Sequence, residues 1–344
     1  MRAYVFSTTL LLIIFVFLGK SFAGDEVNNG GGISEGNIAK SYLNLERYID
    51  LCLNLPSCSL NKEEQALLSE IKTGLKGEYQ NKKQLQFISE RLNPGTFVID
   101  GEMKIAKTGD EIGSVIMVNK DLLYHKNSRT GLTEGIGLEK AVQILVHEMG
   151  HHHGQKDHTL LDLLGAKVSM SLSKNMITAK LLAESEGVKA VVINGKSEEE
   201  FPQILIYVFD QIIDVTAKFK KVLKCKSLGL PIPVNLPTDI VISFSKPTGA
   251  LFHNIYWDKY KFGGMVKKNT GKLVLKGHLS KICGKADNFF FNNKKYKALI
   301  RLKIKKKKND KGQKVWAYEE GSLKVKEDYD PWWKIIRIPF LTDI

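Results

Sequence analysis

The sequence predicts an α+β protein in which a mainly helical domain (residues 37–224) is followed by a β-rich, sandwich-like domain (residues 225–344). Apolar residues recur every three or four positions through most of the first region, which indicates helices. Beyond Cys225 they alternate with polar residues, which indicates strands. A proline-containing stretch at 230–233 reads as a linker, and 344 residues accommodate two domains of ordinary size.

Composition and charge narrow the class of protein. Apolar residues make up 43% of the chain and charged residues 26%, which is ordinary globular composition and excludes a disordered, collagen-like or multi-span membrane protein. The 51 Lys and Arg residues outnumber the 37 Asp and Glu residues, giving a net charge of +14. Such a balance suggests an anionic partner: nucleic acid, a membrane surface or an acidic polymer.

The N-terminus has the layout of a secretory signal peptide over residues 1–23. Arg2 precedes an apolar run at 5–18, and Ser21 and Ala23 place small residues before a cleavage point. The run is too short to span a bilayer comfortably, and an uncleaved anchor is the alternative. We therefore expect an exported protein, periplasmic or secreted. Such a protein rarely meets nucleic acid, so its anionic partners would be cell-surface or membrane polymers.

The four cysteines are Cys52, Cys58, Cys225 and Cys283. An even number in an exported chain favours disulfide bonds, and four cysteines allow three pairings. We expect the local pairing, Cys52 with Cys58 and Cys225 with Cys283, because each pair lies within one compositional region.

The elements of the first region follow in order. Residues 24–36 are rich in Gly, Asn and Ser and predict a flexible leader. Residues 41–92 have helical periodicity, with a capping box formed by Asn61 and Glu64. Short strands are expected at 97–99 and 114–118. A strong helix at 138–153 ends at Gly154, and further helices are expected at 160–172, 176–186 and 203–223.

Period-two alternation marks the strands of the second region. Each set of alternating apolar residues shares one strand face: Ile240, Ile242 and Phe244; Leu273 and Leu275; Ile300, Leu302 and Ile304; Ile336 and Ile338.

One group of residues has the residue types and the spacing of a metal site. His147 and His151 are four residues apart on the predicted helix 138–153, so both imidazoles lie on one face and can reach one zinc ion. Glu148 lies beside the first histidine, where its carboxylate can take a proton from a zinc-bound water without ligating the metal.

The stretch 147–158 resembles the zinc signature of the metzincin metallopeptidases, H-E-x-x-H-x-x-G-x-x-H/D, in the snapalysin-like form with Asp followed by His. Gly154 matches the turn toward the metal. The resemblance covers about a dozen residues. It implies a zincin-like domain with Zn²⁺ held by His147, His151 and Asp157, and Glu148 as the general base for hydrolysis of a peptide or protein substrate.

The third ligand has alternatives. Asp157 is also placed to cap the following helix, His158 is the next candidate, and a gluzincin-like arrangement would use Glu184. Metzincins carry a methionine turn beneath the zinc, for which Met170 and Met176 are the candidates. The N-terminal helices are either a propeptide or a permanent part of the catalytic domain.

The strand expected at 114–118 either borders the cleft, where a free edge would pair with an extended peptide, or is an ordinary core strand.

A basic segment suggests a second function. Arg301, Lys303, Lys305 and Lys307 alternate with apolar residues, so a strand would place their charges on one face. That face is either a solvated sheet surface or a docking site for an anionic surface, with Trp316, Trp332 and Trp333 as possible interface residues. The main hypothesis is thus an exported zinc metalloendopeptidase. The alternative is a surface-binding exported protein that uses its basic β domain and has a structural or vestigial metal site.

Overall fold

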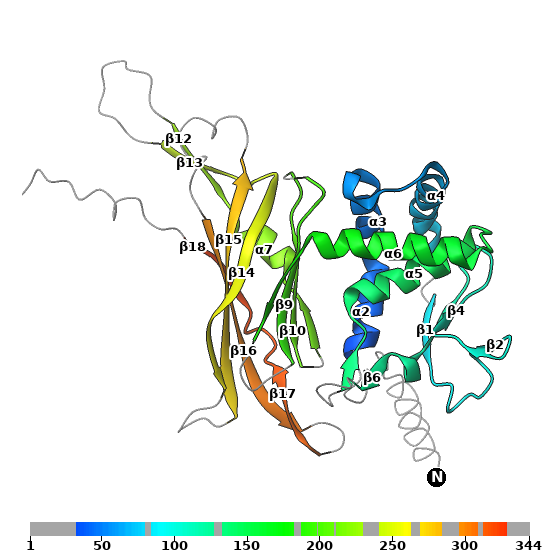
Figure 1. The fold of residues 1–344 in the computed structure, drawn as a ribbon. Coiled ribbons are helices and arrows are strands. Elements are labelled where there is room, and N and C mark those ends of the chain that lie inside the picture. The colour runs from blue at the N-terminus through cyan, green and yellow to red at the C-terminus, as the bar shows by residue number, and fades with distance from the viewer. Residues whose placement is uncertain are drawn as a thin grey trace, which may run out of the picture.

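The computed structural model describes residues 32–79, 84–126, 133–181, 187–197, 199–209, 211–229, 241–262, 269–283, 296–308 and 312–328. These residues form a mixed α+β structure in which a helical layer lies beside two packed sheets (Figure 1). The predicted signal peptide (1–23) and linker (230–233) lie outside the described residues.

Six helical segments build the helical layer: α2 (Gly32–Leu43), α3 (Leu45–Asn54), the 3₁₀ turn η1 (Pro56–Cys58), α4 (Lys62–Glu78), α5 (Leu138–His152) and α6 (His158–Lys174). The predicted capping box is confirmed, because Asn61 and Glu64 satisfy each other's backbone N–H groups at the start of α4. Helix α2 begins at Gly32, so the predicted leader (24–36) is helical over its last residues. Ile38 explains this, since it is buried in the core of the helical layer.

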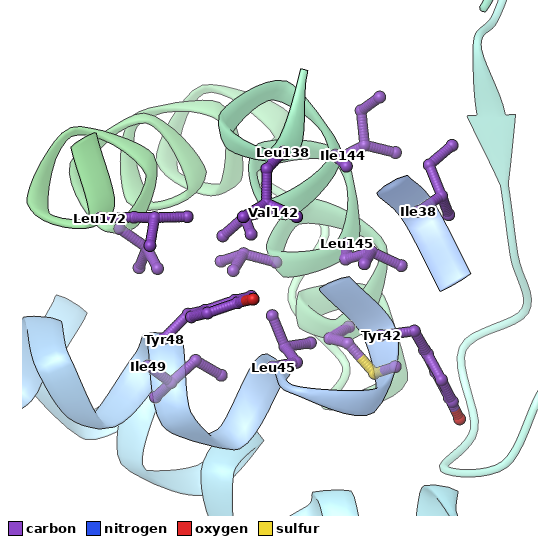
Figure 2. Packing of buried hydrophobic residues seen from close by; sticks show 14 of the residues in the cluster. Ile38, Tyr42, Leu45, Tyr48, Ile49, Leu138, Val142, Ile144, Leu145 and Leu172 are labelled. Carbon is purple, nitrogen blue, oxygen red and sulfur yellow. The ribbon is translucent and has the colours of Figure 1, made fainter. Parts of the chain in front are cut away.

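The helices share one core, in which α2 and α3 pack against α5 and α6 (Figure 2). Leu45 and Tyr48 meet Leu145 and Leu172 there, and all four are fully buried. Burial of large apolar side chains of this kind contributes about 1.5–3 kcal/mol each relative to exposure.

A three-stranded sheet lies at the edge of the helical layer, in the order β1 (Leu85–Ile88), β5 (Ile116–Asn119), β4 (Ala106–Lys107). Strand β1 is parallel to β5, and β4 is antiparallel to it. Two small hairpins accompany it, β2 (Val98–Ile99) with β3 (Glu102–Met103) and β6 (Tyr124–Lys126) with β7 (Thr133–Gly135); the turn η2 (Lys120–Leu122) follows β5.

One sequence prediction is wrong in this region. The helical stretch expected to reach residue 92 ends at Glu78, and residues 85–88 form β1. For the strand expected at 114–118 the sequence allows a free edge at the cleft or an ordinary core strand, and this strand is β5, which is paired on both sides. Its buried Ile116 and Val118 make it the ordinary core strand that the sequence left as the alternative.

A four-stranded antiparallel sheet replaces two predicted helices. Its order is β11 (Gln211–Asp214), β10 (Gln203–Val208), β9 (Val188–Ile193), β8 (Met176–Lys180). Over their described residues, the helices expected at 176–186 and 203–223 are therefore wrong except for α7 (Thr216–Val222). Every residue of β10 is buried. A strand covered on both faces is apolar throughout and loses the period-two signal that separates strand from helix.

A larger antiparallel sheet follows, made of β14 (Gly249–Phe262), β15 (Thr270–Ile282), β16 (Tyr296–Lys308), β17 (Lys314–Tyr318) and β18 (Lys324–Asp328), with β17 and β18 both paired to β16. A separate pair, β12 (Cys225–Gly229) with β13 (Val241–Ser245), stands apart. The predicted alternation is confirmed at Ile300, Leu302 and Ile304, which are all buried.

The four-stranded sheet lies between the helices and the larger sheet (Figure 1). One face gives Val191 and Leu205 to the helical core, while the other gives Val192 and Ile206 to a second core shared with the larger sheet. The sandwich therefore draws on strands that precede residue 225.

Both predicted disulfides are confirmed. Cys52 is bonded to Cys58, and Cys225 is bonded to Cys283 at the end of β15, with Cα atoms 5.2 Å and 5.8 Å apart respectively. Two disulfides fit an oxidising, exported environment. Among the described residues, every helix is too short or too polar to cross a bilayer.

Candidate metal centre

The candidate centre begins on helix α5, which is largely buried. Val142, Leu145 and Met149 anchor the helix in the core at 0–1% exposure, while His147 and His151 lie on a partly exposed face of its last turns. As the four-residue spacing requires, the two imidazoles are one helical turn apart, with ring centroids separated by 5.0 Å.

A tight turn then reverses the chain. Gly154 has φ +74°, a left-handed conformation that is readily available to glycine and ends the helix as predicted. Asp157 caps helix α6: its Oδ1 accepts hydrogen bonds from the N–H groups of Thr159 (2.9 Å) and Leu160 (3.2 Å). Because α6 begins immediately after this cap, His158 occupies its first position.

Helix α6 packs back against α5 at close range. Gly165 is buried, and a Cβ atom at this position would lie only 2.6 Å from the backbone oxygen of Gln143 on α5. The absence of a side chain at residue 165 therefore sets the separation of the two helices, and this separation places His158 over the end of α5.

Three histidines meet at this crossing. His147 Nε2 lies 3.3 Å from His151 Nε2 and 3.2 Å from His158 Nδ1. One ligand nitrogen from each ring lies within 4.8 Å of the others, a spacing that one metal ion can bridge. Three imidazole nitrogens are a known ligand set for catalytic zinc, which keeps its fourth position open. The donor set therefore fits a divalent metal ion such as Zn²⁺.

The opposite nitrogens of two rings are held by acceptors. His147 Nδ1 lies 2.9 Å from Asp162 Oδ1, and His151 Nδ1 lies 2.8 Å from the backbone oxygen of Gln155. When each Nδ1 donates its proton to that oxygen, each Nε2 keeps a lone pair directed at the centre. Metal-binding histidines typically donate the N–H of the nitrogen that does not bind the metal to a carboxylate or a backbone oxygen, as here.

Asp162 has a role that the sequence analysis missed. It lies four residues after His158, on the same side of α6, and this spacing is the signal that could have identified it.

Electrostatics favour neutral imidazoles. Burial lowers the pKa of His147, and this outweighs the opposing effect of Asp162. Burial likewise lowers the pKa of His151. Both rings are therefore largely unprotonated at neutral pH, the form that binds metal.

Glu148 is 6% exposed, and burial raises the pKa of its carboxyl to about 7, with the charge of Asp162 adding to the shift. Within the described part of the chain its side chain makes no hydrogen bond or ion pair, which leaves the carboxyl available for proton transfer.

The structure places the predicted site residues as follows. His147 and His151 come together with His158, the alternative third ligand, while the Asp157 carboxylate is engaged in the helix cap. Glu184 lies outside the described residues. Met170 is 57% exposed on α6, and Met176 is the first residue of β8. Neither methionine therefore lies in a methionine turn.

A buried polar pair fixes the other side of the same helix end. His152 Nδ1 lies 2.6 Å from Glu78 Oε1 on α4, and both side chains are fully buried. The other ring nitrogen of His152 contacts Thr108 Oγ1, just beyond β4. These contacts tie the end of α5 to α4 and to the small sheet. The sequence analysis assigned His152 no role.

Comparisons with protein-family models, with curated proteins and with solved structures found no match. The metzincin resemblance therefore rests on residues 147–158 alone.

Proposed function

We propose that the chain is an exported zinc-dependent metalloendopeptidase in which His147, His151 and His158 hold the metal. One observation carries the proposal: three ligand nitrogens converge within 4.8 Å, and two of the rings are oriented by acceptors on their far nitrogens. Histidine rings whose far nitrogens are hydrogen-bonded in this way are typical of metal sites. In this proposal Asp157 does not bind the metal. It caps helix α6 and so places His158 at the first position of that helix.

Glu148 is proposed as the general base. It follows a ligand directly in the sequence, lies on the helix that carries two of the three ligands, and is buried with no described partner. When bound, zinc supplies a Lewis acid that polarises a carbonyl group and lowers the pKa of water toward about 7. The carboxylate of Glu148 takes a proton from the attacking water and passes it to the departing amine.

The peptide nature of the substrate rests on the motif and on the small sheet. Among the described strands, β4 pairs only with β5, so its other side is an edge. An extended peptide can add to such an edge through backbone hydrogen bonds. Thr108, directly after β4, contacts His152 on α5, which joins this edge to the helix that carries the metal ligands.

The test compares two glutamates of α5. Glu148→Gln is expected to retain bound zinc but to lose about 10²–10⁴-fold in the cleavage rate of a peptide mixture. Glu139→Gln, in the first turn of the same helix, is the matched control and should keep both. Full cleavage by the Glu148 variant would refute its role, and a protein free of zinc after purification without chelators would refute the function.

A further inference from the structure

The larger sheet has two unlike faces. Leu273, Ile300 and Leu302 point inward to the second core. Because side chains alternate along a strand, their sequence neighbours point outward, away from the four-stranded sheet and the helices (Figure 1). We call this second side the outer face.

Lysines are aligned across the outer face. Lys272 on β15 is directly opposite Lys261 on β14 and Lys303 on β16, and all three are exposed. Neighbouring strands are about 4.8 Å apart, so this row places three like charges side by side. Like charges directly opposite one another destabilise a sheet.

The next row along the strands is also basic. Lys259, Arg301 and Lys324 are aligned across β14, β16 and β18, with the apolar Val274 on the intervening strand. No ion pair is formed by any of these cations, or by the three lysines of the first row, within the described residues.

Glu319, directly after β17, is opposite Lys303 and adds one acidic residue to the end of the first row, and in the third row Lys276 pairs with Asp258 at 3.0 Å. A surface selected only for solubility intersperses both signs of charge. The first two rows of the outer face instead carry six cations and one acidic residue, and this excess indicates selection for an anionic partner.

We propose that the outer face is a docking surface for an anionic phospholipid bilayer. Its charges form a two-dimensional array on strands about 4.8 Å apart, with rows about 6.8 Å apart along the strands and one gap at Val274. A planar layer of headgroups can contact all the rows at once, whereas a single linear polyanion can follow only one row. Tyr256, 39% exposed and opposite Lys276, adds an amphipathic ring of the kind enriched at membrane interfaces.

Vesicle binding tests the proposal without reference to the metal site. The full chain is expected to co-sediment with phosphatidylglycerol-containing vesicles at low salt and to dissociate from them at high salt. It is expected not to bind vesicles of pure phosphatidylcholine. Replacing Lys272 and Lys303 with Gln should weaken binding about 25-fold, at about five-fold per charge. The variant Lys272→Arg with Lys303→Arg keeps both charges and should bind the vesicles as the parent does.

The control removes the same charge elsewhere. Lys62→Gln with Lys76→Gln neutralises two exposed lysines on α4, in the helical layer, and should leave binding unchanged. Thermal unfolding should show that the double variant at Lys272 and Lys303 is at least as stable as the parent, because like-charge repulsion is removed. Absence of low-salt binding, an equal loss in the control, or binding to soluble polyphosphate but not to vesicles would overturn the proposal.

Discussion

Replacing Gly165 with alanine should push helix α6 away from α5. The new Cβ would start 2.6 Å from the Gln143 backbone oxygen and 3.2 Å from its Cγ, whereas ordinary contact begins near 3.4 Å. A backbone carbonyl inside a buried helix cannot rotate away as a side chain can. The helices must therefore separate by about 0.8 Å, or the contact must remain strained.

The free-energy change can be bounded. Overpacking destabilises the folded state by about 1–3 kcal/mol, and the higher helix propensity of alanine relative to glycine offsets up to about 1 kcal/mol of this. The net loss then lies between about 0 and 3 kcal/mol, and we expect a value near the middle, about 1–2 kcal/mol, which lowers the melting temperature by several degrees in a chain of this size. Since His158 lies on α6 two turns before Gly165, zinc affinity should also fall.

Thermal unfolding and a zinc competition titration measure the two effects. Gly77→Ala is the matched control: it lies near the end of α4, where the nearest atom, Ile112 Cγ2, is 3.3 Å away on a side chain that is 52% exposed. This variant should be neutral or slightly stabilised. If Gly165→Ala is as stable as the control and binds zinc as tightly as the parent, the close helix crossing does not set the site.

Three further outcomes are expected. Asp162→Asn should weaken zinc binding about 10-fold in a competition titration, because the carboxylate that orients His147 is lost. Asp157→Ser should keep the helix cap and zinc affinity, whereas a ligand role would lose the metal in the same titration. Burial raises the pKa of Glu64, but hydrogen bonds from Lys167 and the N-cap N–H outweigh it, so the pKa lies below its usual value. The resulting stability is present above pH of about 4.3 and is lost as pH falls through the folded-state pKa, so Glu64→Gln should flatten acid unfolding followed by circular dichroism.

The sequence predicted the elements whose signals are local. The Asn61 capping box, the helix ending at Gly154 and the period-two strands of the larger sheet depend on residues close in the chain, and all three are confirmed. The disulfide pairing was predicted from compositional regions and is also confirmed.

The errors arose where tertiary burial removed the pattern. The run at 203–208 is apolar at nearly every position because β10 is covered on both faces, and an uninterrupted apolar run fits helix and strand alike. The pairing of β5 with β1 and β4 depends on residues distant in the sequence, so its central position could not be read from its own residues.

The site was predicted in part for the same reason. The spacing of His147 and His151 is fixed by the helix, so their proximity followed from the sequence. The positions of His158 and Asp162 depend on how closely α6 returns to α5, and this distance is set by a glycine two turns into α6. Nothing local to the motif encodes that distance.

The three-histidine metal site is tested by anomalous scattering at the zinc absorption edge, from crystals of the full chain with one equivalent of zinc. We expect one strong peak about 2.1 Å from His147 Nε2, His151 Nε2 and His158 Nδ1. Absence of a peak at this position, or a peak ligated by Asp157 with His158 turned away, would contradict it.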